Sequence, residues 1–140
     1  MSYSQPAPIL VYDGDCGFCT RSVRFVLDRD RKRQVCFASR GGLAGRGVRE
    51  RHPELELVDS LLWVDRVGGT ERVLIHSDAV IAVAAYLGGI YGVLAKLGGL
   101  VPRVLRDPAY RAVAKVRKSI IRGAPSCLLP SPAELGRMLP

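Results

Sequence analysis

The features of a secreted protein are absent from this sequence. The N-terminus, MSYSQPAPILVYDGD, has no basic segment, and its apolar run is only four residues long. Four cysteines in 140 residues without a signal peptide do not indicate the disulfide framework of a small secreted domain. We therefore expect a cytoplasmic protein whose cysteines form either a working thiol pair or a metal site.

Acidic and aromatic residues are also scarce. Thirteen acids oppose 21 basic residues, which leaves a formal net charge of +8. Residues 21–51 hold ten of the basic residues, and residues 103–122 hold seven more. Such a surface attracts anions, so we expect a weakly bound anionic partner or simply a solvated, arginine-rich exterior. Few aromatic residues lie between the basic ones and no nucleic-acid motif occurs, so we expect no specific nucleic-acid binding.

A long uninterrupted apolar run is missing as well. The longest uncharged stretch, residues 79–95, has 17 residues, which is the short limit for a bilayer-spanning helix. It contains Gly88, Gly89 and Gly92. We interpret it as a buried helix, a break and the start of another helix, and we expect no transmembrane segment.

Hydrophobic periodicity predicts a single α/β domain over residues 1–140. A first helix between two strands predicts a parallel pair, and Gly68-Gly69 predicts a tight hairpin that adds antiparallel strands. The result would be a mixed sheet with flanking helices, a core over about residues 7–88, and a helical extension and tail over about residues 89–140. The expected strands cover residues 8–12, 34–38, 60–64 and 72–75, and the expected helices cover residues 16–30, 77–88, 90–97 and 107–122.

Capping residues predict where the later helices begin and end. Ser77 is a suitable N-cap for the helix after the hairpin, and Gly88 can end it in a left-handed conformation. Asp107 followed by Pro108 is typical of a helix start, with proline in the first helical position. His76 is expected to end a strand, and residues 39–53 are expected to form a loop with one short helix.

The segment VYDGDCGFC carries the chemistry. Cys16 and Cys19 are three residues apart directly after a strand, so they would share one face of the first helix, close enough to form a disulfide. Cys16 would meet unpaired backbone N–H groups and the positive helix end, which stabilise a nucleophilic thiolate. Cys19 would be the shielded, resolving thiol. These positions predict a thiol-disulfide oxidoreductase that needs no cofactor, because the dithiol is itself the redox group.

Two carboxylates flank this pair. Asp15 is placed to cap the first helix, whereas Asp13 could accept a proton from Cys19 or hold the turn. A carboxylate beside a thiolate raises the thiol pKa and opposes the effect of the helix dipole. We therefore include Asp13 and Asp15 with Cys16 and Cys19 in the candidate catalytic site.

These residues resemble the DCC family of thiol-disulfide oxidoreductases, named for the Asp-Cys-Cys pattern that Asp15, Cys16 and Cys19 match. The resemblance covers most of the chain and implies a thioredoxin-like fold with protein or small-molecule thiols and disulfides as substrates. Thioredoxins place a cis-proline before the third strand, whereas this sequence has Val58-Asp59-Ser60 there. Further matching segments are Ser77-Asp78-Ala79, Pro102 with Arg106-Asp107, the spacing of Tyr110, Ala114 and Arg117, and Cys127.

The remaining cysteines and histidines point less clearly to a site. Cys36 in an apolar strand is expected to be buried and inert, and Cys127 in the proline-rich tail is either incidental or a third redox thiol. A zinc site needs four ligands, and His52 and His76 have no ligand spacing. We therefore expect no metal.

Two alternative functions remain. In one, the basic last helix binds phosphates or anionic headgroups without catalysis. In the other, Asp13 and Asp15 act as nucleophile and acid in a haloacid-dehalogenase-like phosphatase that binds magnesium. Gly17 stands where that second family has threonine or valine, and its later lysine and acidic pair have no clear counterparts.

Overall fold

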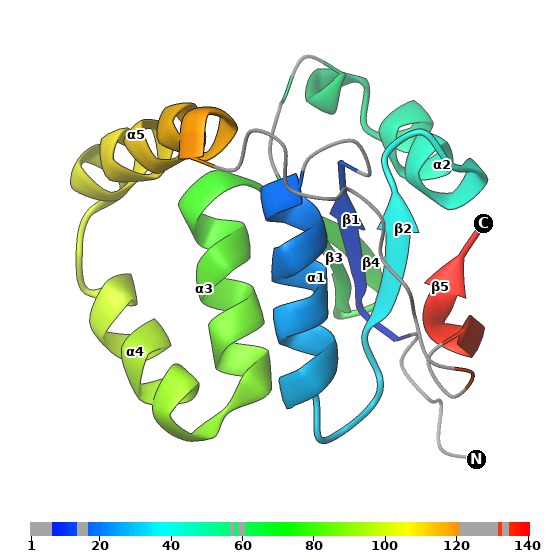
Figure 1. The fold of residues 1–140 in the computed structure, drawn as a ribbon, viewed down its shortest axis with the longest axis horizontal. Helices are drawn as coiled ribbons and strands as arrows, with labels where there is room; N and C mark the ends of the chain where they lie inside the picture. The colour runs from blue at the N-terminus through cyan, green and yellow to red at the C-terminus, as the bar shows by residue number, and fades with distance from the viewer. Residues whose placement is uncertain (1–6, 14–16, 57, 59–60, 121–131, 133–134) are drawn as a thin grey trace.

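The computed structural model describes residues 7–13, 17–56, 58, 61–120, 132 and 135–140, without the side chains of residues 17–20, 114 and 117–120. Strands and helices alternate in the first half of the chain, and helices dominate the second (Figure 1). The elements are β1 (Ile9–Tyr12), α1 (Gly17–Arg29), β2 (Cys36–Ser39), α2 (Leu43–Arg51), η1 (Pro53–Leu55), β3 (Leu62–Val67), β4 (Thr70–Leu74), α3 (His76–Leu87), α4 (Gly89–Gly99), α5 (Arg103–Ile120), η2 (Leu135–Arg137) and β5 (Met138–Leu139).

The five strands form one mixed sheet in the order β4-β3-β1-β2-β5. β1 runs parallel to β2 and antiparallel to β3, and β4 returns antiparallel to β3. The α1 crossover between parallel strands, followed by a hairpin and a helix, is the expected thioredoxin-like α/β arrangement. β5 pairs parallel with β2, and this strand from the C-terminal tail was not predicted.

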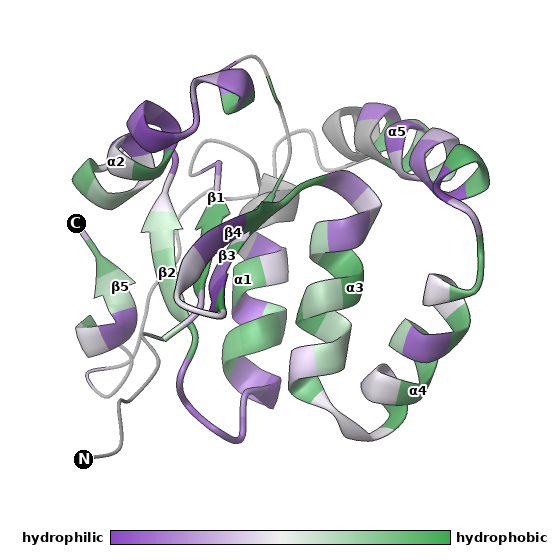
Figure 2. Cartoon of the chain, turned by 180° about the vertical axis from the view of Figure 1, so that it is seen from behind, coloured by the Kyte–Doolittle hydropathy of each residue, from purple (hydrophilic) through white to green (hydrophobic). Residues whose placement is uncertain are grey.

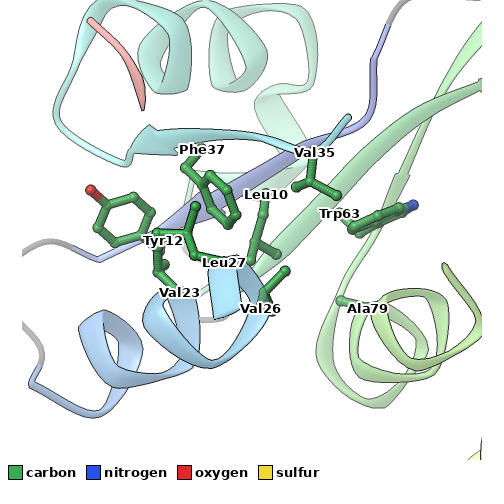
Figure 3. Close-up of a cluster of buried hydrophobic side chains, with 9 residues drawn as sticks. All are labelled: Leu10, Tyr12, Val23, Val26, Leu27, Val35, Phe37, Trp63 and Ala79. Atoms are coloured by element: carbon green, nitrogen blue, oxygen red, sulfur yellow. The ribbon is translucent and has the colours of Figure 1, made fainter. Parts of the chain in front are cut away.

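Helices α1 and α3 cover one face of the sheet, and α2 with η1 packs at one end of the other face, so the central strands have buried residues on both sides (Figure 2). Leu10 and Phe37 point toward α1 and α3, where they pack with Val26 of α1 (Figure 3). Val11 faces the other side and packs in a second cluster with Val48 of α2. Because successive strand residues alternate between faces, β1 contributes to both clusters.

Glycines act as predicted in two turns. Gly68 and Gly69 have φ angles of 59° and 82° in the β3–β4 hairpin, and Gly88 ends α3 with φ 69°. A third glycine has a packing role, because a Cβ on Gly45 would lie 2.2 Å from the Ser39 carbonyl oxygen. Gly45 thus lets α2 approach the end of β2 closely.

The predicted starts of α3 and α5 were wrong. α3 begins at His76, one residue before the predicted Ser77 cap, and Ile75 is its N-cap residue without a side-chain hydrogen bond. α5 begins at Arg103 rather than at Asp107, because the Pro102 carbonyl already accepts hydrogen bonds from the N–H groups of Leu105 and Arg106. Pro108 therefore lies inside the helix, where it removes one intrahelical hydrogen bond.

The buried carboxylate of Asp30, directly after α1, binds the C-terminal segment of the chain. The Asp30 side chain is 1% exposed and forms an ion pair with Arg137, just before β5. It also accepts hydrogen bonds from the Tyr86 hydroxyl at 2.8 Å and from the Arg33 N–H at 3.0 Å. Burial and the hydrogen bond to Asp30 raise the pKa of Tyr86 to about 12, so this hydroxyl stays protonated further into the alkaline range than an exposed tyrosine.

We predict that Asp30→Ala lowers the free energy of unfolding by about 3 to 5 kcal/mol, because it leaves the Arg137 guanidinium partly buried without its partner. Urea denaturation followed by Trp63 fluorescence measures this loss. Asp28→Ala is the control in the same helix: its carboxylate is 53% exposed, so the loss should stay below about 1 kcal/mol. Equal losses for the two variants would contradict a stabilising role for the Asp30 network.

Candidate redox site at the carboxyl edge of the sheet

The Cys-x-x-Cys motif lies at the junction of β1 and α1. β1 ends at Tyr12 and α1 begins at Gly17, so the backbone of Cys19 belongs to the first turn of α1. Asp13 follows β1 directly and is half-buried. Asp15, Cys16 and the side chain of Cys19 lie outside the part of the chain that the structure describes.

Several other elements begin or end at the same edge of the sheet. The parallel pairing of β1 and β2 brings Tyr12 opposite Ser39 at their carboxyl ends. Antiparallel β3 starts at this edge, since Leu62 pairs with Val11, and β4 ends there. The amino-terminal ends of α1 and α3 therefore lie on one side of the molecule (Figure 1). Both helix dipoles direct their positive ends to this edge, which favours an anion such as a thiolate there.

The start of α3 is joined to α5 by polar side chains. The Ser77 hydroxyl donates a hydrogen bond to Asp107 at 2.5 Å. Asp78 forms ion pairs with Arg106 at 3.1 Å and Arg103 at 3.0 Å. The hydrogen bond from Ser77 is the main cause that lowers the pKa of Asp107. We call these five residues the α3–α5 clamp.

The clamp brings together two segments that sequence reasoning treated separately. Ser77 and Asp107 are 30 residues apart, and each was predicted to cap its own helix. The sequence offered two signals for this contact: the complementary charges of Asp78 and Arg106, and the resemblance of both segments to the DCC family. Many other arginines in the chain offered the same complementarity, so the partner could not be identified from charge alone.

His76 was also misplaced by the sequence analysis, because it begins α3 instead of ending a strand. Its φ angle of 52° is in the left-handed region, which is rare for a residue other than glycine. Its ring packs edge-to-face on Tyr110 of α5, with the ring centroids 5.4 Å apart. Strained backbone conformations of this kind persist where the surrounding structure holds the residue in place, and they are frequent at active sites and ligand-binding sites.

The other candidate ligands and thiols lie elsewhere. Cys36 is the first residue of β2, opposite Ile9, and so lies at the other edge of the sheet. It is a free, half-buried thiol rather than the fully buried one that was predicted. His52 contacts Glu71 at 2.8 Å, and no cluster of three potential metal ligands occurs among the residues described. Cys127 lies outside those residues.

The chain matches the model of the DCC1-like thiol-disulfide oxidoreductase family over residues 10–122, from β1 to just past the end of α5. The chain belongs to this family. It is 29% identical to the uncharacterized protein YuxK of Bacillus subtilis over 136 residues, which cover 96% of both chains. It is 30% identical over 123 residues to a chloroplastic DCC family protein of Arabidopsis thaliana, which covers 87% of this chain and 69% of the plant protein.

No solved structure matches the chain. The region that the family model covers includes both the Cys-x-x-Cys motif and all five residues of the α3–α5 clamp. None of the helices among the described residues is long and apolar enough to cross a membrane.

We predict that Asp78→Asn loosens the contact between α3 and α5. The substitution removes both ion pairs and leaves Arg106, whose side chain is 15% exposed, without a carboxylate. The free energy of unfolding should fall by about 1 to 2 kcal/mol, and backbone amides near the start of α5 should exchange hydrogen faster.

Arg103→Gln is the matched control, because the Arg103 side chain is 70% exposed and its ion pair is screened by water. Urea denaturation and hydrogen–deuterium exchange read by mass spectrometry compare the two variants. If Arg103→Gln changed exchange as much as Asp78→Asn, the partly buried Arg106 pair would not be what holds α5 in place.

Proposed function

We propose that this DCC1-like protein is an enzyme that exchanges electrons with disulfides through Cys16 and Cys19. The observation that carries the proposal is the motif's place between the end of β1 and the first turn of α1. A thiol at that place meets unpaired helix N–H groups and the positive end of the dipole. Membership in a family of thiol-disulfide oxidoreductases supports the same chemistry.

The proposed reaction has two exchange steps. The Cys16 thiolate attacks one sulfur of a substrate disulfide, so that a mixed disulfide forms and the other substrate sulfur leaves as a thiolate that takes up a proton. Cys19 then loses its proton and attacks the Cys16 sulfur. The Cys16–Cys19 disulfide forms and the second substrate thiol is released. Two electrons and two protons pass to the substrate, and the same steps run backwards oxidise a dithiol.

Asp13 and Asp15 would modulate these steps. In the proposal Asp15 caps α1, and Asp13 either accepts the proton that Cys19 loses or holds the turn. A carboxylate close to the pair raises the thiol pKa, whereas the helix dipole lowers it. The balance between these two effects would set the nucleophilicity of Cys16.

The segment before β3 is relevant to which disulfides the protein can bind. Val58-Asp59-Ser60 contains no proline, so the groove that a cis-proline shapes in thioredoxins would be built differently here. We therefore propose disulfides of proteins or small molecules as the substrate class, without the peptide-groove specificity of thioredoxin.

We predict that purified protein titrated against glutathione forms a reversible disulfide between Cys16 and Cys19, detected by thiol alkylation and peptide mass mapping. Cys16→Ser should abolish exchange with glutathione disulfide, because it removes the attacking thiolate. Cys19→Ser should accumulate the mixed disulfide at Cys16, because the resolving thiol is missing.

Cys36→Ser is the matched control, since Cys36 lies at the opposite edge of the sheet, and it should leave the redox midpoint unchanged. Cys127→Ser tests whether a third thiol takes part. The proposal fails if Cys16 and Cys19 do not pair at any glutathione ratio, or if Cys36→Ser removes the exchange as completely as Cys16→Ser.

A further inference from the structure

Helix α4 has two apolar faces, of which only one is covered by the protein. On the inner face the Tyr91 hydroxyl accepts a hydrogen bond from Arg29 at 2.8 Å, and its ring packs on Phe25. Ala95 on the same face is buried, and Gly98 lies against Ile81 of α3. This face holds α4 to α1 and α3.

The other face of α4 is apolar and exposed. Ile90, Val93, Leu94 and Leu97 follow the spacing of one helix face, and each side chain is more than half exposed. More exposed aliphatic residues follow in the link between α4 and α5 and in the first turn of α5. We call the whole set the outer apolar surface, which consists of Ile90, Val93, Leu94, Leu97, Leu100, Val101, Val104 and Leu105.

This surface lies on the outermost layer of the molecule. In Figures 1 and 2, α4 lies beside α3 on the side away from β5, and α5 follows it near the end where α3 begins. Figure 2 shows hydrophobic colouring on α4 and on its connection to α5. Soluble monomers seldom expose so many contiguous aliphatic residues, and patches of this kind mark interaction sites.

The charges around the surface are mostly positive. Residues 78–120 contain seven basic residues and two acids, Asp78 and Asp107. Asp78 pairs with Arg103 and Arg106, and Asp107 accepts the Ser77 hydrogen bond. Lys96 and Lys115 are exposed and form no ion pair within the described part of the chain. A second copy of the chain would bring the same positive charges together, so the charges favour an anionic partner.

The composition of the surface favours lipid over an acidic protein. Protein interfaces rely on aromatic anchors such as tyrosine and tryptophan, but the tyrosine of α4 points inward and the outer residues are aliphatic. Aliphatic side chains next to lysines and arginines are typical of helices that lie in the interface of an anionic bilayer.

We propose that the α4–α5 segment binds the surface of an anionic membrane, with the outer apolar surface inserted among the headgroups and the basic side chains against lipid phosphates. Binding of this kind is peripheral and reversible. It does not depend on the thiol pair, so the proposal stands or falls separately from the redox function.

The test is co-sedimentation of the full chain with vesicles. We expect binding to vesicles of phosphatidylcholine mixed with phosphatidylglycerol, little binding to phosphatidylcholine alone, and weaker binding as salt rises. The double substitution Leu94→Glu with Leu97→Glu should weaken binding by roughly tenfold or more, because it puts charge into the inserted surface. Leu43→Glu is the matched control: Leu43 is 74% exposed but lies in α2, and binding should not change.

A second measurement does not rely on disruptive substitutions. Leu97→Trp places an indole on the outer apolar surface, while Trp63 is 3% exposed in the core. Brominated acyl chains should quench the new fluorescence in anionic vesicles and leave that of Trp63 unchanged. Cys16→Ser should bind vesicles like the unchanged chain.

Three results would overturn the proposal. The first is no binding to anionic vesicles at low salt. The second is equal binding by the chain and by the Leu94→Glu, Leu97→Glu variant. The third is a concentration-dependent dimer in sedimentation analysis that the same double substitution abolishes, which would make a second copy of the chain the occupant of this surface.

Discussion

The pairing and packing of β1 hold the rest of the structure together. This strand of four residues bonds to β2 on one side and β3 on the other, and its side chains enter the clusters on both faces of the sheet. In the sequence, the Cys-x-x-Cys motif begins four residues after the end of β1. β1 is buried on both faces and paired on both edges, so the point where the chain leaves β1 toward α1 is fixed in position.

The helical second half of the chain is connected to that same edge. The α3–α5 clamp ties Ser77 and Asp78 to Arg106 and Asp107, so α5 is docked where α3 begins. The outer apolar surface of α4 and α5 therefore lies on two helices that each pack against α3.

Much of this arrangement was predictable from the residues because it depends on local rules. Alternating and 3.6-residue apolar patterns indicated the sheet and helices, and Gly68-Gly69 and Gly88 marked their turns through positive φ angles. The errors arose where a distant contact outweighed a local preference. Asp107 and Pro108 are typical of a helix start, but Pro102 already provides one and Asp107 bonds to Ser77. β5 was missed since two residues, Met138 and Leu139, are too few to show a pattern.

The sequence by itself predicted the chemistry that we propose, because two thiols three residues apart after an apolar strand are expected to share one face at the start of a helix. It also determined the excess of positive charge. Tertiary structure alone decided which faces are covered. An apolar helix such as α4 has the same sequence pattern whether its second face meets protein, lipid or water. In the structure Tyr91, Ala95 and Gly98 pack inward, and this packing leaves Leu94 and Leu97 exposed on the other face. The partners of Asp30 and Asp78 were likewise set by the fold, because charge complementarity in an arginine-rich chain does not select one arginine over another.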